Sequence, residues 1–304
     1  MTIVISNCSK RKRFPAASAL HARELTIGSM NRVAASWSDR LQAAESATIA
    51  KDLYAGRAFH EAAQAAIELG ARLAIVSAGL GLVDGAVSVP GYSLTTARRD
   101  PDNILLKTGG SAAEWWAALQ THSPFHTTAV EEEDGLILAA LSSSYLAMVA
   151  DEWARWPVDR IMRLRLFTKE VPQGVSEGLR KAWMPYDDRL DALGNGHAGT
   201  QSDFAQRALR HFATTIGDRG ALEQDRLAVE SSLRGLQTRQ VPKRTRTTDE
   251  DILAVISAEW EAVEGRSGQM LRHLRDTLGV ACEQGRFKEL FGQVAAEKKE
   301  GHAA

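Results

Sequence analysis

The chain has 304 residues, of which 44% are hydrophobic and 25% charged, a balance typical of a globular protein with one large domain or two smaller ones. Because 37 Lys and Arg residues stand against 38 Asp and Glu residues, the net charge of −1 excludes a global field that draws the protein to a polyanion. The two cysteines, Cys8 and Cys282, form no CxxC pair, so neither a structural zinc site nor a disulfide framework is predicted.

The first hundred residues alternate predicted strands and helices, which is the pattern of an α/β fold. A β-branched run at 2–6 predicts a buried strand. Residues 14–49 predict an inserted helical excursion, and 58–69 predict an amphipathic helix that Gly70 ends. The next buried strand, at 73–77, completes a strand–helix–strand unit with a right-handed parallel crossover.

The same alternation continues towards residue 237. A third buried strand is predicted at 136–141, followed by a helix that begins in the serine run 142–144. A charged fourth strand is predicted at 160–166 and a helix at 203–216. We therefore predict that residues 1–237 form a three-layer α/β sandwich with a mostly parallel central sheet.

The C-terminal part of the chain is predicted to be a separate all-α domain. Residues 238–248 are polar and basic, contain a proline and have no apolar period, which indicates a linker. Helices are predicted at about 249–262, 266–278 and 282–297, joined by turns that contain glycine. This pattern predicts that residues 249–304 form a small helix-turn-helix domain.

Two loops that follow predicted parallel strands carry the first candidate site. The segment Asn7–Arg13 offers an amide, a thiol, a hydroxyl and four cations, a set that suits a phosphate. The segment Ser77–Gly85 is predicted to be a glycine-rich loop that carries one carboxylate, Asp84. Because the carboxyl ends of parallel strands meet at one edge, we expect the two loops to face one another. The alternative is that the glycines only form a tight turn and that Asp84 caps the next element.

The residues and the order of four motifs add a family resemblance. Cys8–Lys10, Asp52–Arg57, Val76–Asp84 and Pro90–Thr95 occur in this order within the first hundred residues. The series resembles a bacterial and phage family related to the YaaA-like peroxide-stress proteins and to accessory domains of archaeosine-type transglycosylases. The pattern in that family is roughly CSK, LY, LSAKYGL and PYD, and some bacterial anti-phage DNA glycosylases look similar.

The resemblance implies an α/β/α fold like that of uracil-DNA glycosylase, and work on nucleobases. Two departures matter: Ala78-Gly79-Leu80 lacks the Lys–Tyr pair of the family, and Tyr92 is followed by Ser93 instead of Asp. The second departure removes a candidate carboxylate and makes Asp84 more prominent. The residues that these motifs and loops offer to a nucleotide or phosphate are Asn7, Cys8, Ser9, Lys10, Tyr54, Arg57, Ser77, Gly79 and Tyr92.

A second candidate segment combines aromatic and acidic residues. Tyr186 is followed by Asp187, Asp188 and Arg189, and an aromatic ring can stack on a base while a carboxylate stabilises an oxocarbenium-like centre or activates water. Asp203 is a further candidate, although it can equally serve the first turn of the following helix. Asp84 is the first choice for the catalytic carboxylate and Asp188 the second.

The C-terminal helices carry candidate DNA contacts. Gln284, Arg286 and Lys288 lie near a predicted helix start, where side chains can meet base edges or phosphates. Arg244, Arg272 and Arg275 add local positive charge. The alternative is a helical packing domain with a solvated charged face.

These features together predict a DNA N-glycosylase that excises a modified base and leaves an abasic site, a role that the resemblance connects with defence against phages. The alternatives are a nucleobase transglycosylase or nucleotide hydrolase, and a non-catalytic DNA-binding or stress-response protein. We expect DNA as the partner, no cofactor and no metal. We also expect no membrane association and a cytoplasmic location, since no signal peptide is visible and no apolar run approaches the length of a membrane span.

Overall fold

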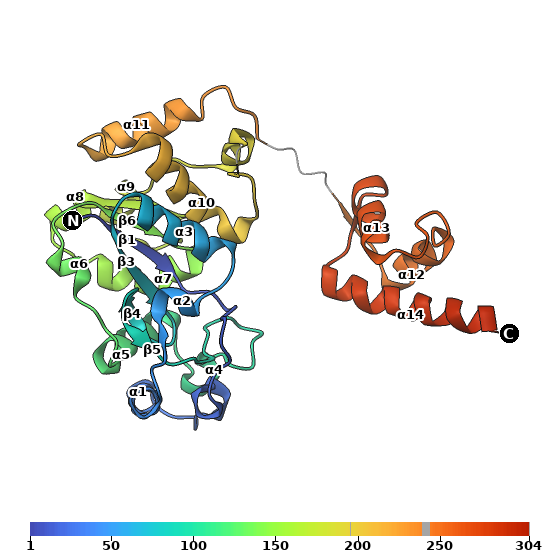
Figure 1. Ribbon diagram of the computed structural model, residues 1–304, viewed down its shortest axis with the longest axis horizontal. Helices are drawn as coiled ribbons and strands as arrows, with labels where there is room; N and C mark the ends of the chain where they lie inside the picture. Colours follow the sequence, from blue (N-terminus) through green and yellow to red (C-terminus); the bar gives the residue numbers. More distant parts are fainter. Residues whose placement is uncertain (195, 239–243, 304) are drawn as a thin grey trace. The chain divides into compact units, whose positions relative to one another are not determined.

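A five-stranded sheet in the order β4-β3-β1-β6-β7 organises the N-terminal part of the protein (Figure 1). The computed structural model describes residues 1–194, 196–238 and 244–303, with side chains up to residue 298. The pairs β1–β3, β1–β6 and β6–β7 are parallel, and β4 alone runs antiparallel to β3. This sheet confirms the predicted α/β class. The strands are β1 (Ile3–Asn7), β3 (Arg72–Ser77), β4 (Gly81–Asp84), β6 (Ile137–Ala140) and β7 (Leu164–Phe167).

Helices cover both faces of the sheet, and its strands are therefore buried on both sides. On β1, Ile3 and Ile5 pack into one hydrophobic cluster and Val4 into another. The Ile3 face is covered by α1 (Met30–Ala43), α5 (Ala112–His122) and α7 (Ser143–Trp153). The Val4 face is covered by α3 (Arg57–Glu68) and α10 (Phe204–His211) (Figure 1).

Shorter elements complete this part of the chain. They are η1 (Ser18–Leu20), η2 (Ala22–Glu24), β2 (Thr48–Ile49), α2 (Ala50–Leu53), β5 (Ser88–Val89), α4 (Leu105–Thr108), α6 (Ala129–Glu132), α8 (Val158–Arg163), α9 (Glu177–Lys181), η3 (Asp188–Leu193), η4 (Gln201–Asp203), the π-helical turn η5 (Phe212–Ile216) and α11 (Leu222–Ser232).

Two predicted elements differ in extent from the structure. The expected strand at 160–166 is a helical turn, α8, followed by β7, because only Leu164–Phe167 has a continuous buried run. Arg165 within β7 is 2% exposed, and its guanidinium donates to buried Asp225 at 2.5 Å. The expected excursion at 14–49 is helical mainly in α1, since two short 3-10 turns and extended chain fill the rest.

The chain reverses its direction of winding between β1 and β6. From β1 the chain passes through α3 to β3 on one side, and from β6 it passes through α7 to β7 on the other side. The helices α3 and α7 accordingly lie on opposite faces of the sheet. In open α/β sheets, such a switch point opens a crevice at the carboxyl ends of the two strands.

Residues 240–304 form a second compact unit, separate from residues 1–239. It contains β8 (Thr245–Arg246), α12 (Asp249–Ala258), α13 (Ser267–Arg272), the π-helical turn η6 (His273–Thr277), β9 (Val280–Ala281) and α14 (Gln284–Ala303). The short strands β8 and β9 pair in parallel, and the helices share a core that includes Ile256, Leu274 and Phe287.

The predicted linker at 238–248 differs from the structure at its C-terminal end. Residues 239–243 lie outside the described part of the chain. Thr245–Arg246 belong to β8, and Thr248 caps α12 by accepting the Asp251 N–H at 3.2 Å. Across the described ranges, no helix combines the length and apolar character needed to cross a membrane.

Candidate functional site at the carboxyl edge of the sheet

The switch point brings Asn7, at the end of β1, against the start of α7. The Asn7 side-chain oxygen accepts the Ser142 N–H at 3.0 Å and the Gln206 amide at 3.2 Å. Gln206 is 1% exposed and also donates to the Ala140 carbonyl at 3.1 Å, while its own amide oxygen has no hydrogen-bond partner in the described chain. Asn7 therefore joins the two halves of the sheet at the place where a ligand site is expected.

A cavity of about 590 Å³ lies next to this junction. Its walls come from the segments that follow β6 and β7, from η4 and from the first turn of α10: Ser142, Ser143, Ser144, Lys169, Glu170, Gln201, Ser202 and Ala205. No side chain caps the first turn of α7, so its first backbone N–H groups are open to an acceptor. Serine hydroxyls, a lysine and an open helix N-terminus are groups that bind phosphate.

Asp188 lies at the rim of this cavity. Its carboxylate accepts hydrogen bonds from Lys169 and, at 3.3 Å, from Gln201, and both of these residues line the cavity. The bond from Lys169, followed by that from Gln201, outweighs burial and holds the pKa of Asp188 below its ordinary value. Asp188 is therefore an ionised carboxylate beside a lysine, with 46% of its side chain exposed.

Cys8, just after Asn7, contacts a buried group of aromatic residues. Its Sγ lies 3.0 Å from the hydroxyl of Tyr145 in the first turn of α7. The ammonium of Lys12 lies 4.2 Å from the ring centre of Tyr92, and burial lowers the pKa of Lys12 despite the opposing charges of Cys8, Asp100 and Asp102. Burial also raises the pKa of Tyr145 well above its ordinary value.

Tyr54, Ser77 and Tyr92, which come from three of the ordered motifs, form one buried network. The Tyr92 hydroxyl lies 2.6 Å from Ser77 Oγ and 3.0 Å from the Tyr54 hydroxyl. Burial raises the pKa of both tyrosines far above the usual range. With relative exposures of 1% or less, these residues belong to the protein core and do not face solvent.

Gly79 belongs to the turn that follows this network. A Cβ at Gly79 would lie 2.3 Å from the ring of Tyr92, and the indoles of Trp37 and Trp115 donate to the Gly79 and Ala78 carbonyls. Gly79 is needed because Tyr92 packs directly against it. Its predicted contact with a ligand is replaced by a contact with the protein itself.

Asp84 lies at the opposite edge of the sheet from the one that the sequence predicts. Residues 81–84 form a strand and not a loop, and β4 returns antiparallel to β3, so that Asp84 pairs with Ala74. The Asp84 carboxylate accepts the Arg72 guanidinium at 2.5 Å. The expectation that Asp84 faces the basic turn is therefore wrong, because strand direction carries it away from the carboxyl edge.

Ser9 and Lys10 lie in the turn itself but have partners within the protein. The Ser9 hydroxyl donates to the Arg11 and Ala55 carbonyls, each at 2.7 Å. The exposed Lys10 ammonium lies 2.5 Å from the buried Asp100 carboxylate. Neither contact blocks a phosphate outright, yet Lys12, and not Lys10, is the lysine that packs against the tyrosine network.

The remaining predicted residues of this unit serve packing or capping. Tyr186 is 2% exposed, and its hydroxyl lies 2.9 Å from His211 Nδ1. Arg189 pairs with Asp187 at 2.8 Å. Asp203 forms a capping box with Thr200, accepts the buried Arg207 guanidinium at 2.7 Å and lies 3.9 Å from Arg57. Asp203 thus lies in the first turn of η4 with Thr200 as the N-cap, as the alternative interpretation expects.

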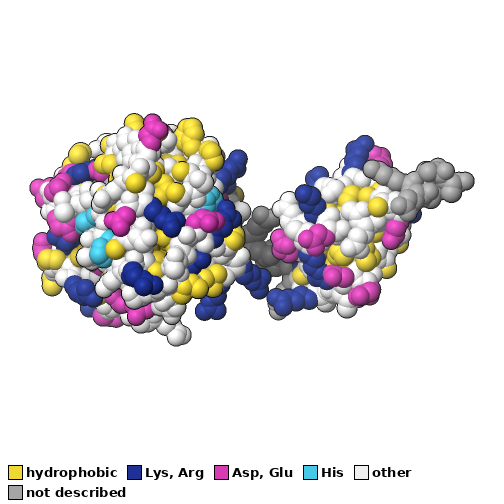
Figure 2. Space-filling view, turned by 90° about the horizontal axis from the view of Figure 1, so that it is seen from below, with side chains coloured by type: hydrophobic (Ala, Val, Ile, Leu, Met, Phe, Trp, Pro, Cys, Tyr) yellow, Lys and Arg dark blue, Asp and Glu magenta, His cyan; other side chains and the backbone are white. Residues whose placement is uncertain are grey.

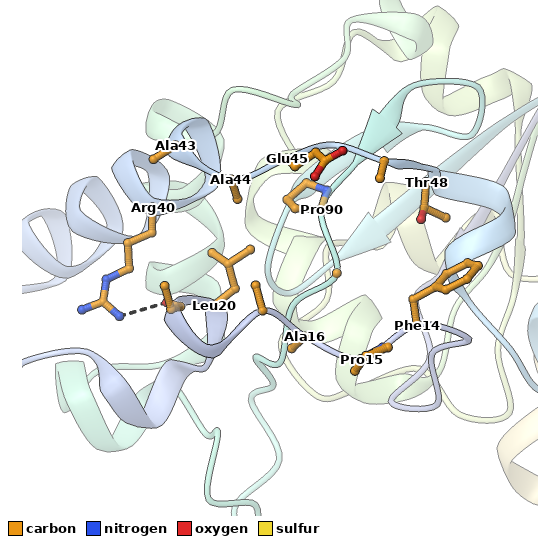
Figure 3. A pocket seen from close by; sticks show the side chains of 14 residues that line it. Phe14, Pro15, Ala16, Leu20, Arg40, Ala43, Ala44, Glu45, Thr48 and Pro90 are labelled. Carbon is orange, nitrogen blue, oxygen red and sulfur yellow. Dashed lines mark hydrogen bonds between the residues drawn. The ribbon is translucent and has the colours of Figure 1, made fainter.

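A second cavity of about 690 Å³ lies beside the predicted excursion (Figure 3). Phe14, Pro15, Leu20 and Pro90 give it a mainly apolar lining. Arg40 also lines it, but its guanidinium donates to the Ala19 and Glu24 carbonyls at 3.1 and 3.0 Å. This cavity contains none of the sequence-predicted site residues, so the polar cavity at the sheet edge is the better candidate for a nucleotide.

The predicted DNA contacts of the C-terminal unit fall into two groups. Arg244, Arg275 and Arg286 line one cavity, together with Arg246. Arg272, Gln284 and Lys288 are exposed and do not line it. Figure 2 shows Lys and Arg side chains interspersed with Asp and Glu on the visible face of each unit, as the net charge near zero requires.

Comparison of the chain with models of known protein families, with curated proteins and with solved structures finds no significant match. The family resemblance of the ordered motifs therefore stays a prediction. Within the described ranges, no cluster of three or more His, Cys, Asp or Glu residues is arranged to hold a metal ion.

Sequence reasoning missed Lys169, Gln201 and Gln206 as residues of the site. A signal exists for Lys169, which follows the buried end of β7 by two residues. The predicted strand at 160–166 begins four residues before β7 and ends one residue before it, and the residues that follow it are not among the candidates. No local signal distinguishes Lys12 from Lys10, because the bridge between Lys12 and Tyr54 decides which side chain turns inward.

Proposed function

We propose that this protein is a DNA N-glycosylase that binds an extruded nucleotide at the carboxyl ends of β6 and β7. The observation that carries the proposal is a pair of charged residues at a cavity beside the switch point of the sheet: Lys169 lines the cavity and bonds Asp188, and the other wall is a serine-lined helix N-terminus. The serine-lined wall suits a backbone phosphate, and the pair supplies an ionised carboxylate beside it.

In this proposal Asp188 stabilises the positive charge that develops on the sugar and orients a water molecule. The water adds to C1′ while the bond from C1′ to the base nitrogen breaks, the base leaves with a proton, and an abasic sugar remains. Base flipping delivers the sugar to the site, and a modified base is the substrate that the motif resemblance implies. The C-terminal unit would hold the DNA.

The test is alkali-sensitive strand breakage after incubation with unmodified DNA and with phage DNA that carries modified bases. The wild-type protein is expected to produce breaks, and Asp188→Asn is expected to slow their formation by about 100-fold or more. Asp84→Asn is the matched control, since it removes a carboxylate of the same unit that lies away from the site.

Other outcomes separate the alternatives. Equal rates for Asp188→Asn and the wild type would overturn the role of Asp188. DNA binding without breaks on any DNA would favour the non-catalytic protein, and exchange of the base for a free base would identify a transglycosylase.

A further inference from the structure

Four arginines of the C-terminal unit converge on one cavity of about 620 Å³. They come from three places in the unit: Arg244 and Arg246 from β8 and the residue before it, Arg275 from η6, and Arg286 from the first turn of α14. The pairing of β8 with β9 brings these segments together. The cluster is thus a product of the fold, because its members are up to 42 residues apart in sequence.

Three of these guanidinium groups are held in place by the surrounding chain. Arg275 donates to the Cys282 carbonyl at 2.7 and 3.1 Å, and Arg244 donates to the Arg275 carbonyl at 3.0 Å and to Asp276 at 2.9 Å. Arg286 donates to Asp249 at 2.6 Å and to the Thr247 carbonyl at 3.0 Å. Such bracing positions the side chains before a ligand arrives, which lowers the entropy cost of binding.

The cavity keeps an excess of positive charge. Asp249 and Asp276 offset two of the arginines. Glu283 also lines the cavity, but its carboxylate accepts the Gly285 and Arg286 N–H groups at 2.9 and 3.0 Å and so caps α14. The Arg246 guanidinium makes no hydrogen bond or ion pair with any residue that the structure describes.

We infer that this arginine cavity binds a phosphodiester group of the DNA backbone and is the main DNA contact of the C-terminal unit. Guanidinium groups match the geometry of phosphate oxygens, and several of them around one concave surface favour a phosphate over a single weak anion. The inference rests on the proposed action on DNA. It makes this contact independent of base sequence, because backbone contacts position the duplex without reading it.

The test measures binding of labelled duplex DNA by the full-length chain at several salt concentrations. Arg246→Glu is expected to weaken binding about tenfold at about 0.1 M salt and to reduce the salt dependence by about one phosphate contact. Among the described residues the Arg246 side chain has no partner, so its replacement leaves the packing of the unit intact. Arg266→Glu in the same unit and Lys181→Glu in the other unit are matched controls, since these exposed residues lie outside the cavity and are not candidate DNA contacts. Each is expected to change binding less than about twofold.

The inference is overturned if Arg246→Glu binds as the wild type does, or if the two controls weaken binding as much. A second titration separates the sources of phosphate: binding of inorganic phosphate that Arg246→Glu abolishes, together with DNA binding that Arg246→Glu leaves unchanged, would show a free-anion site and contradict a DNA contact. Abasic-site formation is scored separately. If Arg246→Glu loses DNA binding and the wild-type protein releases no base from any DNA, the glycosylase proposal is refuted and the inference about the arginine cavity is supported.

Discussion

At the scale of single residues, Lys169 controls the charge of Asp188. Its hydrogen bond lowers the pKa of Asp188, so the carboxylate stays ionised as the pH falls below the ordinary Asp range of about 4. In Lys169→Met the pKa of Asp188 is expected to rise, and the acidic limb of the kcat profile for base release is expected to move about one pH unit upward. Lys181→Met, which changes an exposed residue outside the cavity, should leave the acidic limb of the kcat profile where it is. An unmoved acidic limb in Lys169→Met would show that Lys169 does not set the pKa of Asp188.

His211 predicts a second pH effect, on stability. Burial, followed by the charge of His197, lowers the pKa of His211 to about 4. Below about pH 6.5 the unfolded chain takes up a proton that the folded chain refuses, so folding stability falls between about pH 6.5 and 4 by up to about 3 kcal/mol. Urea unfolding at pH 7 and 4.5 should show a smaller difference in His211→Gln than in the wild type. The exposed His60→Gln variant should keep the full change in unfolding free energy between the two pH values. If His211→Gln also keeps the full change, other titrating groups cause it.

At the scale of elements, the turn between β3 and β4 is predicted to be intolerant of a side chain at Gly79. Tyr92 cannot retreat from an added Cβ, because Ser77 and Tyr54 hold its hydroxyl. Gly79→Ala is therefore expected to lower the free energy of unfolding by about 1 to 3 kcal/mol. In the control Gly178→Ala, the new Cβ meets Ile161 at an ordinary 3.5 Å, and stability should stay the same or rise slightly. Thermal unfolding that ranks the two variants equally would contradict the packing of Tyr92 on Gly79.

At the scale of the whole molecule, the two units have separate hydrophobic cores. A chain ending at residue 239 is therefore expected to keep its sheet and its candidate site, to lose DNA affinity and to show a shallower salt dependence. Circular dichroism checks the fold, binding titrations check the affinity, and abasic-site formation at saturating DNA checks the site. Unchanged affinity after truncation would show that the C-terminal unit does not hold DNA.

Local patterns in the sequence determined much of the architecture. Buried apolar runs indicated β1, β3 and β6. Amphipathic spacing indicated α3 and α10, because burial of one face imposes a period on the residues that form it. Asn7 was also predicted at the carboxyl edge, since parallel strands end at a common edge.

Only the tertiary structure decided which side chains meet. The direction of β4 removed Asp84 from the site, because a strand of four residues carries no local signal that distinguishes parallel from antiparallel pairing. The Lys169–Asp188 pair and the arginine cavity join segments that no sequence period connects, since the packing of elements and not their spacing sets such contacts. The sequence by itself thus determined the α/β framework and the edge where a ligand is expected. The fold places Asp188, and not Asp84, at that edge.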